Sequence, residues 1–515
     1  MPLAPKIISD LQQIVGQENV LTVWRRCFTL HLLLAVTAYA STALGVENPP
    51  EFLWASQFGE TKGLESCALT TDQNGDIFVT GIMGLKQHQS LGTHGWSRSG
   101  GEVFLAKFDS AGKKLWLQTA GGNGTDNGLA VASDDANNIY VTGYFSGTIK
   151  FQNLKLKALE DEKTRGQLPP DIFLAKYNPD GKPLWVQQAG GAQLDQTYGI
   201  ATDKKGNVYI TGYFQGRATF GALKLQSRSQ PDGYHDPDPD YGDMFVAKYN
   251  ADGQLQWVRQ AGESGKNVAY AIATDDVGNI YLTGSFNSGE KTNAISFGDI
   301  KVTSTDLNGF IAKYDTNGKI LWAQPTAGDQ YYHHNQIAVD ATGHAFIAGD
   351  FRFSDKFASL ARISRSARNS DIFLVKYNAD GKILWCKQAG GQHVEFCGLA
   401  VDQGGNAVVT GVFDEAATFD NIQIHAKAHD PRISGYESFL AHYSPDGEAI
   451  WVKSIDRNVN LRAVTLDKKG IACLTGTFNL PITLDHINLT PPTNFLKELF
   501  DERTTDVFVT KLRNK

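Results

Sequence analysis

Cysteine is scarce in this chain, and its spacing matches no metal or redox motif. The 515 residues include only five cysteines, and no two of them form a C-x-x-C pair. A zinc ribbon and a dithiol redox centre are therefore excluded on sequence grounds. We expect buried free thiols, although an exported protein can form disulfides, and that alternative stays open. The cysteines concerned, outside the N-terminal apolar segment, are Cys67, Cys386, Cys397 and Cys473.

Excess positive charge is also absent. Lysine and arginine number 48 against 55 aspartates and glutamates, which gives a net charge of −7. Without a broad basic field we expect no nucleic-acid partner. The sequence further lacks a P-loop, a dinucleotide fingerprint and a Ser-His-Asp arrangement in a fitting context. We therefore predict no organic cofactor, and the sequence favours a non-enzymatic protein while leaving catalysis open.

Long hydrophobic runs are missing except near the N-terminus. An apolar stretch follows Arg25-Arg26 and contains the small-x-small cleavage pattern Ala38-Tyr39-Ala40. This arrangement is typical of a secretory signal. The stretch is short for a membrane span, and an uncleaved anchor or a buried helix are the alternatives. We expect residues 1–45 to be a signal peptide or N-terminal hydrophobic segment, and the protein to be exported to the periplasm, the extracellular space or the cell surface.

Glycine, in contrast, is abundant, and its 52 copies recur at fixed places in a repeat of about 66 residues. Three signatures occur seven times each. One is an Asp-turn-strand-Gly element such as TDKKGNVYITG, and another is an aromatic strand such as DIFLAKY. The third is a tryptophan strand, whose tryptophans are Trp54, Trp116, Trp185, Trp257, Trp322, Trp385 and Trp451. A fixed period with four strand-like runs predicts a β-propeller.

The phase of the repeat at the chain ends predicts how the propeller closes. Within one repeat the strands follow the order A, B, C and D, with tight A–B and C–D turns. The first segment, EFLWASQ around Trp54, reads as a lone D strand, and the last, DVFVTKL, reads as a C strand. We therefore predict an all-β, seven-bladed propeller over residues 46–515 with four antiparallel strands per blade. The N-terminal strand would complete the last blade in a 3+1 closure, which removes an open edge.

The repeat resembles a known family. Units of the form D-x-x-G-N-x-Y-x-T-G-x-F, followed by D-x-F-x-x-K-Y-x-x-D-G-x-x-x-W, are similar to the bacterial seven-bladed beta-propeller repeat called SBBP. The resemblance covers all the units. It implies exported or surface proteins with poorly defined roles, and it supplies no catalytic residues.

Strand order places the long insertions on one face. The A–B and C–D turns lie at one end of the blades, and the B–C insertions and D–A loops lie at the other. Variable loops on a rigid scaffold commonly bind partners. We expect a monomer that binds a protein or glycan partner at the cell envelope through this face. The insertions could instead merely shield blade edges. The candidate partner-binding residues are Asp195, Tyr198, Tyr270, Tyr331, Tyr332, His333, His334, His393 and Arg462.

Two further functions stay open on the sequence. One is a lyase or hydrolase acting on a polysaccharide at the channel mouth, and the other is a structural scaffold or spacer. Calcium is the one ion considered, because alternating carboxylates supply hard oxygen ligands. Its candidate ligands are Asp236, Asp238 and Asp240. An acidic solvated loop is the alternative for that segment.

Two repeated features are predicted to be structural. The turn aspartates are expected to cap their own turns and to pair with the lysine of strand C in the same blade. The tryptophan of strand D is expected to pack between blades.

Overall fold

The computed structural model of the chain describes only strands and their connections in the residues that it places. These are residues 47–59, 63–85, 101–159, 169–228, 242–287, 293–304, 309–326, 335–351, 371–427, 436–478, 480–490 and 506–513. Within these ranges there is no helix, and so none that could cross a membrane. The chain divides into two compact parts, Met1–Pro49 and Pro50–Lys515. The predicted signal segment lies outside the described residues.

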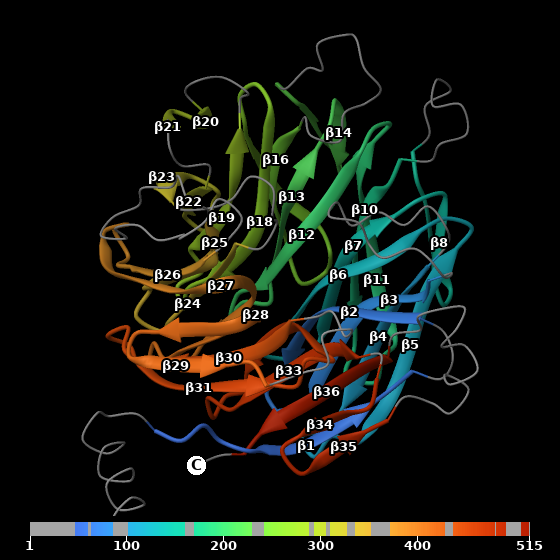
Figure 1. The fold of residues 1–515 in the computed structure, drawn as a ribbon. Coiled ribbons are helices and arrows are strands. Elements are labelled where there is room, and N and C mark those ends of the chain that lie inside the picture. The colour runs from blue at the N-terminus through green and yellow to red at the C-terminus, as the bar shows by residue number, and fades with distance from the viewer. Residues whose placement is uncertain are drawn as a thin grey trace, which may run out of the picture. The chain divides into compact units, whose positions relative to one another are not determined.

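Four-stranded antiparallel units recur along the second part, as the sequence predicted (Figure 1). Unit 1 contains β2 (Gly63–Thr71), β3 (Ile77–Leu85), β4 (Glu102–Phe108) and β5 (Lys114–Gly122). Unit 2 contains β6 (Asp126–Ser133), β7 (Ile139–Phe145), β10 (Asp171–Tyr177) and β11 (Pro183–Gly191). Unit 3 contains β12 (Asp195–Thr202), β13 (Val208–Phe214), β16 (Asp243–Tyr249) and β17 (Leu255–Ala261). In each unit these strands correspond to the predicted strands A to D.

The later units follow the same order with two variations. Unit 4 contains β18 (Lys266–Thr274), β19 (Ile280–Asn287), β22 (Gly309–Tyr314) and β23 (Ile320–Thr326). Unit 5 contains β24 (Gln336–Val339), β25 (Ala345–Phe351), β26 (Asp371–Tyr377) and the start of β27 (Ile383–Val401). Because β27 continues without a break, its second half is the first strand of unit 6, beside β28 (Ala407–Phe419), β30 (Glu437–Tyr443) and β31 (Ala449–Ile455).

Unit 7 joins the two ends of the chain. It contains β32 (Val459–Leu466), β33 (Ala472–Phe478), β36 (Asp506–Leu512) and β1 (Phe52–Gln57). The sheet runs in the order β1-β36-β33-β32, and β1 pairs antiparallel with β36 (Figure 1). The N-terminal strand is therefore the fourth strand of this unit.

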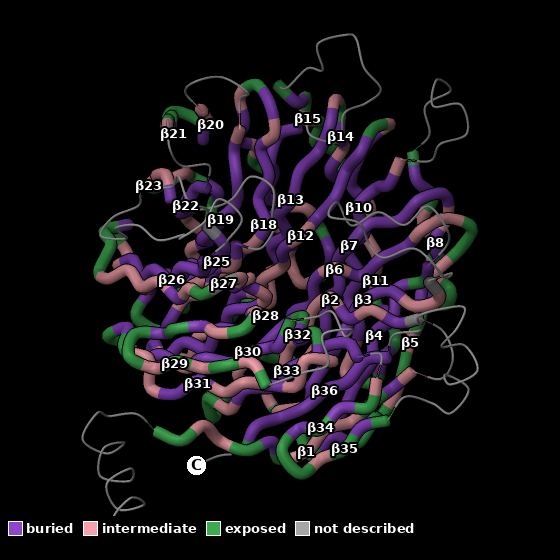
Figure 2. The backbone as a smooth tube through the Cα atoms, in the orientation of Figure 1, coloured by how far each residue is buried: buried purple, intermediate pink, exposed green. Residues whose placement is uncertain are grey.

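The middle strands of the units carry the core. Every residue of β7, β10, β13 and β36 is buried, on both faces of the strand (Figure 2). Strands with two buried faces must be covered by a neighbouring sheet on each side. The hydrophobic clusters confirm this, because one cluster joins Ile172 of unit 2 to Phe245 of unit 3. The core therefore lies between the units and not within one of them.

A repeated contact explains the tryptophan signature. Trp185 Nε1 donates to the carbonyl oxygen of Ala251 at 3.1 Å, in the C–D turn of the next unit, and Lys176 Nζ donates to the same oxygen at 3.0 Å. Gly253 of that turn lies against the indole ring, where an added Cβ would come within 2.8 Å of Trp185. The same three-part contact, which we call the staple, recurs along the chain and confirms that the tryptophan packs between units. Its other tryptophan–carbonyl pairs are Trp116–Pro179, Trp257–Thr316, Trp322–Ala379 and Trp385–Pro445.

The predicted Asp–Lys pairs are present in units 2, 4, 5 and 7. Lys176 Nζ lies 4.0 Å from Asp134 Oδ2 in unit 2, and Lys511 Nζ lies 2.8 Å from Asp467 Oδ2 in unit 7. Each turn aspartate also caps its turn, as where Asp134 Oδ1 accepts the N–H groups of residues 136 and 138. The further pairs are Lys313–Asp275 and Lys376–Asp340. In unit 1 Lys107 pairs at 3.0 Å with Asp76, four residues after the turn aspartate.

The insertions begin with short hairpins that cover the outer edges of the units. The hairpin of β14 (Arg217–Phe220) and β15 (Leu223–Gln226) follows strand B of unit 3 but pairs with β11, the last strand of unit 2. The hairpin of β8 (Thr148–Phe151) and β9 (Leu154–Lys157) covers β5 of unit 1 in the same way. In unit 6 the end of β28 pairs with β29 (Ile422–His425) and with β27. These hairpins protect sheet edges from foreign strands.

Two more insertion hairpins form separate two-stranded sheets. They are β20 (Asn293–Phe297) with β21 (Ile300–Ser304), and β34 (Ile482–Leu484) with β35 (Ile487–Leu489). Edge covering, which the sequence left as the alternative, is thus seen for the insertion hairpins of units 2, 3 and 6.

Candidate functional site

A β-bulge interrupts the first strand of most units at one and the same position. In unit 3 the pairing of β12 with β13 skips Tyr198, and in unit 7 the pairing of β32 with β33 skips Arg462. A bulge leaves one residue out of the ladder and re-aims its side chain. We call these the bulge residues: Cys67, Leu129, Tyr198, Tyr270, Cys397 and Arg462. Asn335, which precedes β24, occupies the corresponding place in unit 5.

Most bulge residues are at least partly accessible, whereas Tyr270 and the equivalent Asn335 are buried. Arg462 is exposed between the buried residues Leu461 and Ala463, and Cys67 is half-buried beside the buried Ser66. The bulges therefore turn a side chain away from the core in most units. Unlike the staple, this position holds five types of residue in the seven units, and five of the seven side chains are at least partly accessible.

Arg462, the bulge residue of unit 7, acts electrostatically on groups of units 1 and 6. Burial raises the pKa of Glu65, and the positive charge of Arg462 opposes that rise. Burial also raises the thiol pKa of both Cys67 and Cys397 to about 12, again against the effect of Arg462. Both thiols are thus protonated and unreactive at neutral pH. All four described cysteines are free, as expected.

The bulge residues of units 3 and 4 form an aromatic cluster instead. The Tyr198 ring stacks on Tyr213 at 6.1 Å and meets the edge of Tyr270 at 5.5 Å. The Tyr198 hydroxyl donates to Gln196 Oε1 at 2.8 Å. Val268 and Leu194 complete the cluster. Tyr198 and Tyr270, both predicted site residues, are therefore brought together.

His393 has two side-chain partners, Glu395 and Tyr436, and sequence reasoning missed Tyr436. Its Nε2 lies 2.8 Å from Glu395 Oε1, and its ring stacks on Tyr436 at 4.5 Å with an angle of 14° between the planes. All three side chains are accessible, and Tyr436 is 41% exposed. Glu395 and Tyr436 are separated by 41 positions in the numbering, so only the pairing of β28 with both β27 and β30 places them together.

Asp195 is buried and supports the chain around it. It is 0% exposed, its Oδ2 accepts the N–H of Gly191 at 2.6 Å, and its Oδ1 accepts the N–H of Gln215 at 3.3 Å. Burial raises its pKa well above the ordinary value, and the neighbouring Asp171 raises it further. A side chain in this position holds the D–A loop and does not present a surface to a partner.

Carboxylates at the start of strand C anchor the insertions. Asp171 Oδ2 accepts the N–H of Leu159 at 2.9 Å, and Asp243 Oδ2 accepts that of Arg228 at 3.0 Å. In both cases the donor is the last described residue of the insertion before a gap. The scaffold thus fixes the roots of the insertions rigidly.

Several predicted site residues lie outside the described ranges. These are Tyr331, Tyr332, His333 and His334 of one D–A loop, and the calcium candidates Asp236, Asp238 and Asp240. Among the residues that are described, no three His, Cys, Asp or Glu side chains gather as metal ligands would.

Comparison with known proteins supports the repeat. A family model, the beta-propeller repeat SBBP, matches residues 184–213 and 256–289. These two segments support the beta-propeller repeat in this chain. The chain is 23% identical to the uncharacterized WD repeat-containing protein L264 of Acanthamoeba polyphaga mimivirus, over 84% of this chain and 36% of that protein. It is 26% identical to the regulatory protein FlaEY of Caulobacter vibrioides, over 30% of this chain and 15% of FlaEY. The chain thus spans about a third or less of the length of these relatives.

Solved structures of similar arrangement include enzymes and proteins of unknown function. A streptogramin B lyase matches with 8% identity and a TM-score of 0.41, over 89% of this chain and 98% of the lyase. A polysaccharide lyase of family PL25, an ulvan lyase, matches with 11% identity and a TM-score of 0.41, over 82% of this chain and 93% of the lyase.

Proposed function

We propose that the units are the seven blades of one closed propeller, with β1 completing the last blade in a 3+1 arrangement. The first strands of successive units contact one another from β2 through β32, and β32 contacts β2 again. One hydrophobic cluster joins Ala463 and Val507 of unit 7 to Val79 and Phe104 of unit 1. Trp54 Nε1 donates to the Ser110 carbonyl at 3.2 Å, which repeats the tryptophan contact across the same junction. A ring accounts for all three contacts.

The propeller binds a partner at the end of its axis that carries the insertions. The observation that carries this proposal is the bulge position, where an otherwise regular repeat varies its residue and leaves five of the seven side chains at least partly accessible. A scaffold without a ligand needs no such variation, because the staple and the turns alone hold the blades. Bulges are frequent beside binding sites, since they re-aim side chains.

The chemistry of this entrance suits a polar polymer. Units 6, 7 and 1 contribute the charged and hydrogen-bonding groups of Arg462, Glu65 and the His393–Glu395 pair, and units 3 and 4 contribute the aromatic cluster around Tyr198. Aromatic faces and polar groups together suit glycans and peptide segments. We propose a glycan or protein of the cell envelope as the partner of an exported, monomeric and non-enzymatic protein. We assign the His393–Glu395–Tyr436 cluster to binding, because its accessible ring and charged groups can contact a partner directly.

A pull-down on cell-envelope fractions and immobilised glycans tests this function. The mature protein is compared with the double variant Arg462→Ala, Tyr198→Ala and with the control Lys224→Ala, which removes an exposed cation from the edge hairpin β15. We expect the double variant to retain at most a tenth of the captured material and the control to retain all of it. Equal capture by all three proteins would reject the entrance as the site. A parallel arm with a chelator tests the calcium expectation at Asp236, Asp238 and Asp240.

A further inference from the structure

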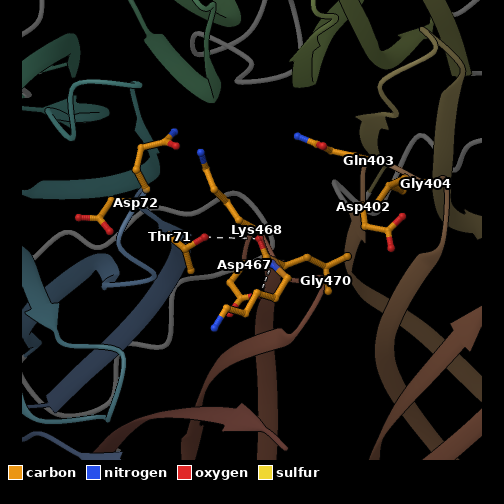
Figure 3. A pocket seen from close by; sticks show the side chains of 12 residues that line it. Thr71, Asp72, Asp402, Gln403, Gly404, Asp467, Lys468 and Gly470 are labelled. Carbon is orange, nitrogen blue, oxygen red and sulfur yellow. Dashed lines mark hydrogen bonds between the residues drawn. The ribbon is translucent and has the colours of Figure 1, made fainter. Parts of the chain in front are cut away.

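A second site lies at the opposite ends of the first strands, away from the insertions. A pocket of about 400 Å³ is lined by the A–B turns of units 1, 6 and 7 (Figure 3). Val401 and Leu466, the last residues of β27 and β32, form its apolar part, and Thr71, the last residue of β2, lies beside them. Figure 3 shows Thr71 and Asp72 on one side, Asp402, Gln403 and Gly404 on the other, and Asp467 and Lys468 between them.

The pocket lies where a ladder of hydrogen bonds between the units is interrupted. The Ser133 hydroxyl donates to the Thr71 carbonyl, that of Thr202 to Ser133, and that of Thr274 to Thr202, at 2.7–2.8 Å. Each donor is the residue just before a turn aspartate. In units 5, 6 and 7 this place is taken by Val339, Val401 and Leu466, which have no hydroxyl. The Thr71 hydroxyl extends the ladder to the Leu466 carbonyl of unit 7 at 3.4 Å. The ladder ends there, because Leu466 has no hydroxyl to donate to Val401 of unit 6, and these two apolar side chains line the opening.

Neighbouring A–B turns are also linked in pairs, and unit 7 has no such link. Gln73 Nε2 donates to Asp135 Oδ1 at 2.7 Å between units 1 and 2, and Lys204 pairs with Asp276 at 2.7 Å between units 3 and 4. The N–H of Ala341 donates to the Gln403 carbonyl at 3.4 Å between units 5 and 6. All these residues directly follow a turn aspartate.

Lys468 directly follows the turn aspartate of unit 7. Because the A–B turns of units 1 to 6 are linked two by two, the turn of unit 7 is left without a partner turn. Among the described residues no hydrogen bond or ion pair joins its side chain, or that of Lys469, to another residue. Both lysines are exposed at the rim of the pocket. By contrast, the three carboxylates of the lining, Asp72, Asp402 and Asp467, cap their own turns, and Asp467 is also neutralised by Lys511. The rim therefore offers two exposed ammonium groups beside an apolar floor.

We infer that this pocket binds a small organic carboxylate with a short apolar body. The carboxylate would lie at Lys468 and Lys469, because these are the ammonium groups whose charge is not already paired. The apolar body would cover Val401 and Leu466 and exclude water from them. A volume of 400 Å³ admits a molecule of the size of a short fatty acid or an aromatic acid. This site is independent of the proposed function, since it lies at the other ends of the strands.

Saturation-transfer NMR titrations of the full chain with acetate, butanoate and hexanoate test the inference. We expect the affinity to rise about fourfold for each buried methylene, so that hexanoate binds at least tenfold more tightly than butanoate. Hexylammonium and inorganic phosphate should each bind at least tenfold more weakly than hexanoate. Equal binding of hexylammonium would reject the role of the lysines, and equal binding of phosphate would reject the apolar floor.

Matched variants separate this site from a general surface effect. Lys468→Gln with Lys469→Gln should weaken hexanoate binding about tenfold, because two exposed charges are removed. The control is Lys204→Gln with Lys205→Gln, the same residues in the A–B turn of unit 3, and it should bind as the unchanged protein does. Leu466→Thr, which restores a hydroxyl to the ladder, should also weaken binding. A loss of the same size in the control, or no loss in the first variant, would overturn the inference.

Discussion

Gly253→Ala should destabilise the protein more than the same substitution at Gly75, although both glycines lie in tight turns with a left-handed backbone. Their φ angles are 81° and 76°. The surroundings differ, because a Cβ on Gly253 would lie 2.8 Å from Cδ2 of Trp185, whereas one on Gly75 would have its nearest neighbour, Ser110 Cβ, at 3.8 Å. The comparison therefore isolates the contact between the turn and the indole ring.

The two costs can be worked out separately. A left-handed backbone costs an alanine about 1–2 kcal/mol in either turn. At Gly253 the new methyl group must also displace Trp185, and overpacking of this kind adds about 1–3 kcal/mol. Since the indole donates to the carbonyl of Ala251 in the same turn, the displacement also strains that hydrogen bond. We expect a total of about 2–5 kcal/mol for Gly253→Ala and about 1–2 kcal/mol for Gly75→Ala.

Differential scanning calorimetry measures this difference. For a cooperative part as long as Pro50–Lys515 the entropy of unfolding is about 1 kcal/mol/K, so each kcal/mol lowers Tm by about 1 °C. Gly253→Ala should therefore lower Tm by about 2–5 °C and Gly75→Ala by about 1–2 °C, with a change in tryptophan emission in the first variant alone. Equal shifts in Tm would refute the reasoning, because they would show that the ring does not require a glycine beneath it.

Two further predictions concern buried charges. Burial raises the pKa of Asp171 to about 7, against the hydrogen bonds from Leu159 and Gln188. A carboxyl group whose pKa is raised on folding penalises the folded state above that pKa, and the penalty disappears as the pH falls towards the unfolded value of about 4. The unchanged protein should therefore gain stability relative to Asp171→Asn between pH 8 and pH 5, as measured by Tm across that range; a constant difference would contradict the raised pKa. Lys376→Met should lower the free energy of unfolding in urea by about 2–3 kcal/mol, because it leaves Asp340 without its lysine and the Pro445 carbonyl without that donor. The control is His442→Met at the same place in unit 6, which should cost less than half as much. Equal costs would show that the lysine has no special role.

Much of the scaffold could be predicted from the sequence because its signals repeat. The tryptophan, the lysine and the turn glycine recur at fixed spacing, and the structure unites them in the staple. The pairing of the N-terminal strand with the last strand also followed from the phase of the repeat. Each of these inferences needs only the order of strands, which a periodic sequence makes visible.

The candidate sites were less predictable because they depend on contacts between units. The insertion hairpins cover the last strand of the preceding unit, as β14 does with β11, and no local pattern indicates that partner. The stacking of His393 on Tyr436 depends on the order of strands in the sheet. The interrupted hydroxyl ladder at Val401 and Leu466 becomes visible only when equivalent strand ends are compared in space. Sequence reasoning therefore located one face of interest and missed the pocket at the other.

The single exception in the lysine series indicates where the proposed ring closes. Each staple lysine donates to a carbonyl in the C–D turn of the next unit, as Lys376 does to Pro445. Unit 6 is followed by unit 7, whose third and fourth strands, β36 and β1, come from opposite ends of the chain and so are not joined by such a turn. A lysine at that place would have no turn carbonyl to bind. Unit 6 carries His442 instead, and its ring packs on Trp451 at 5.2 Å. The departure from the repeat is thus what the missing turn requires. It marks unit 7, which lies between unit 6 and unit 1, as the place where the proposed ring closes.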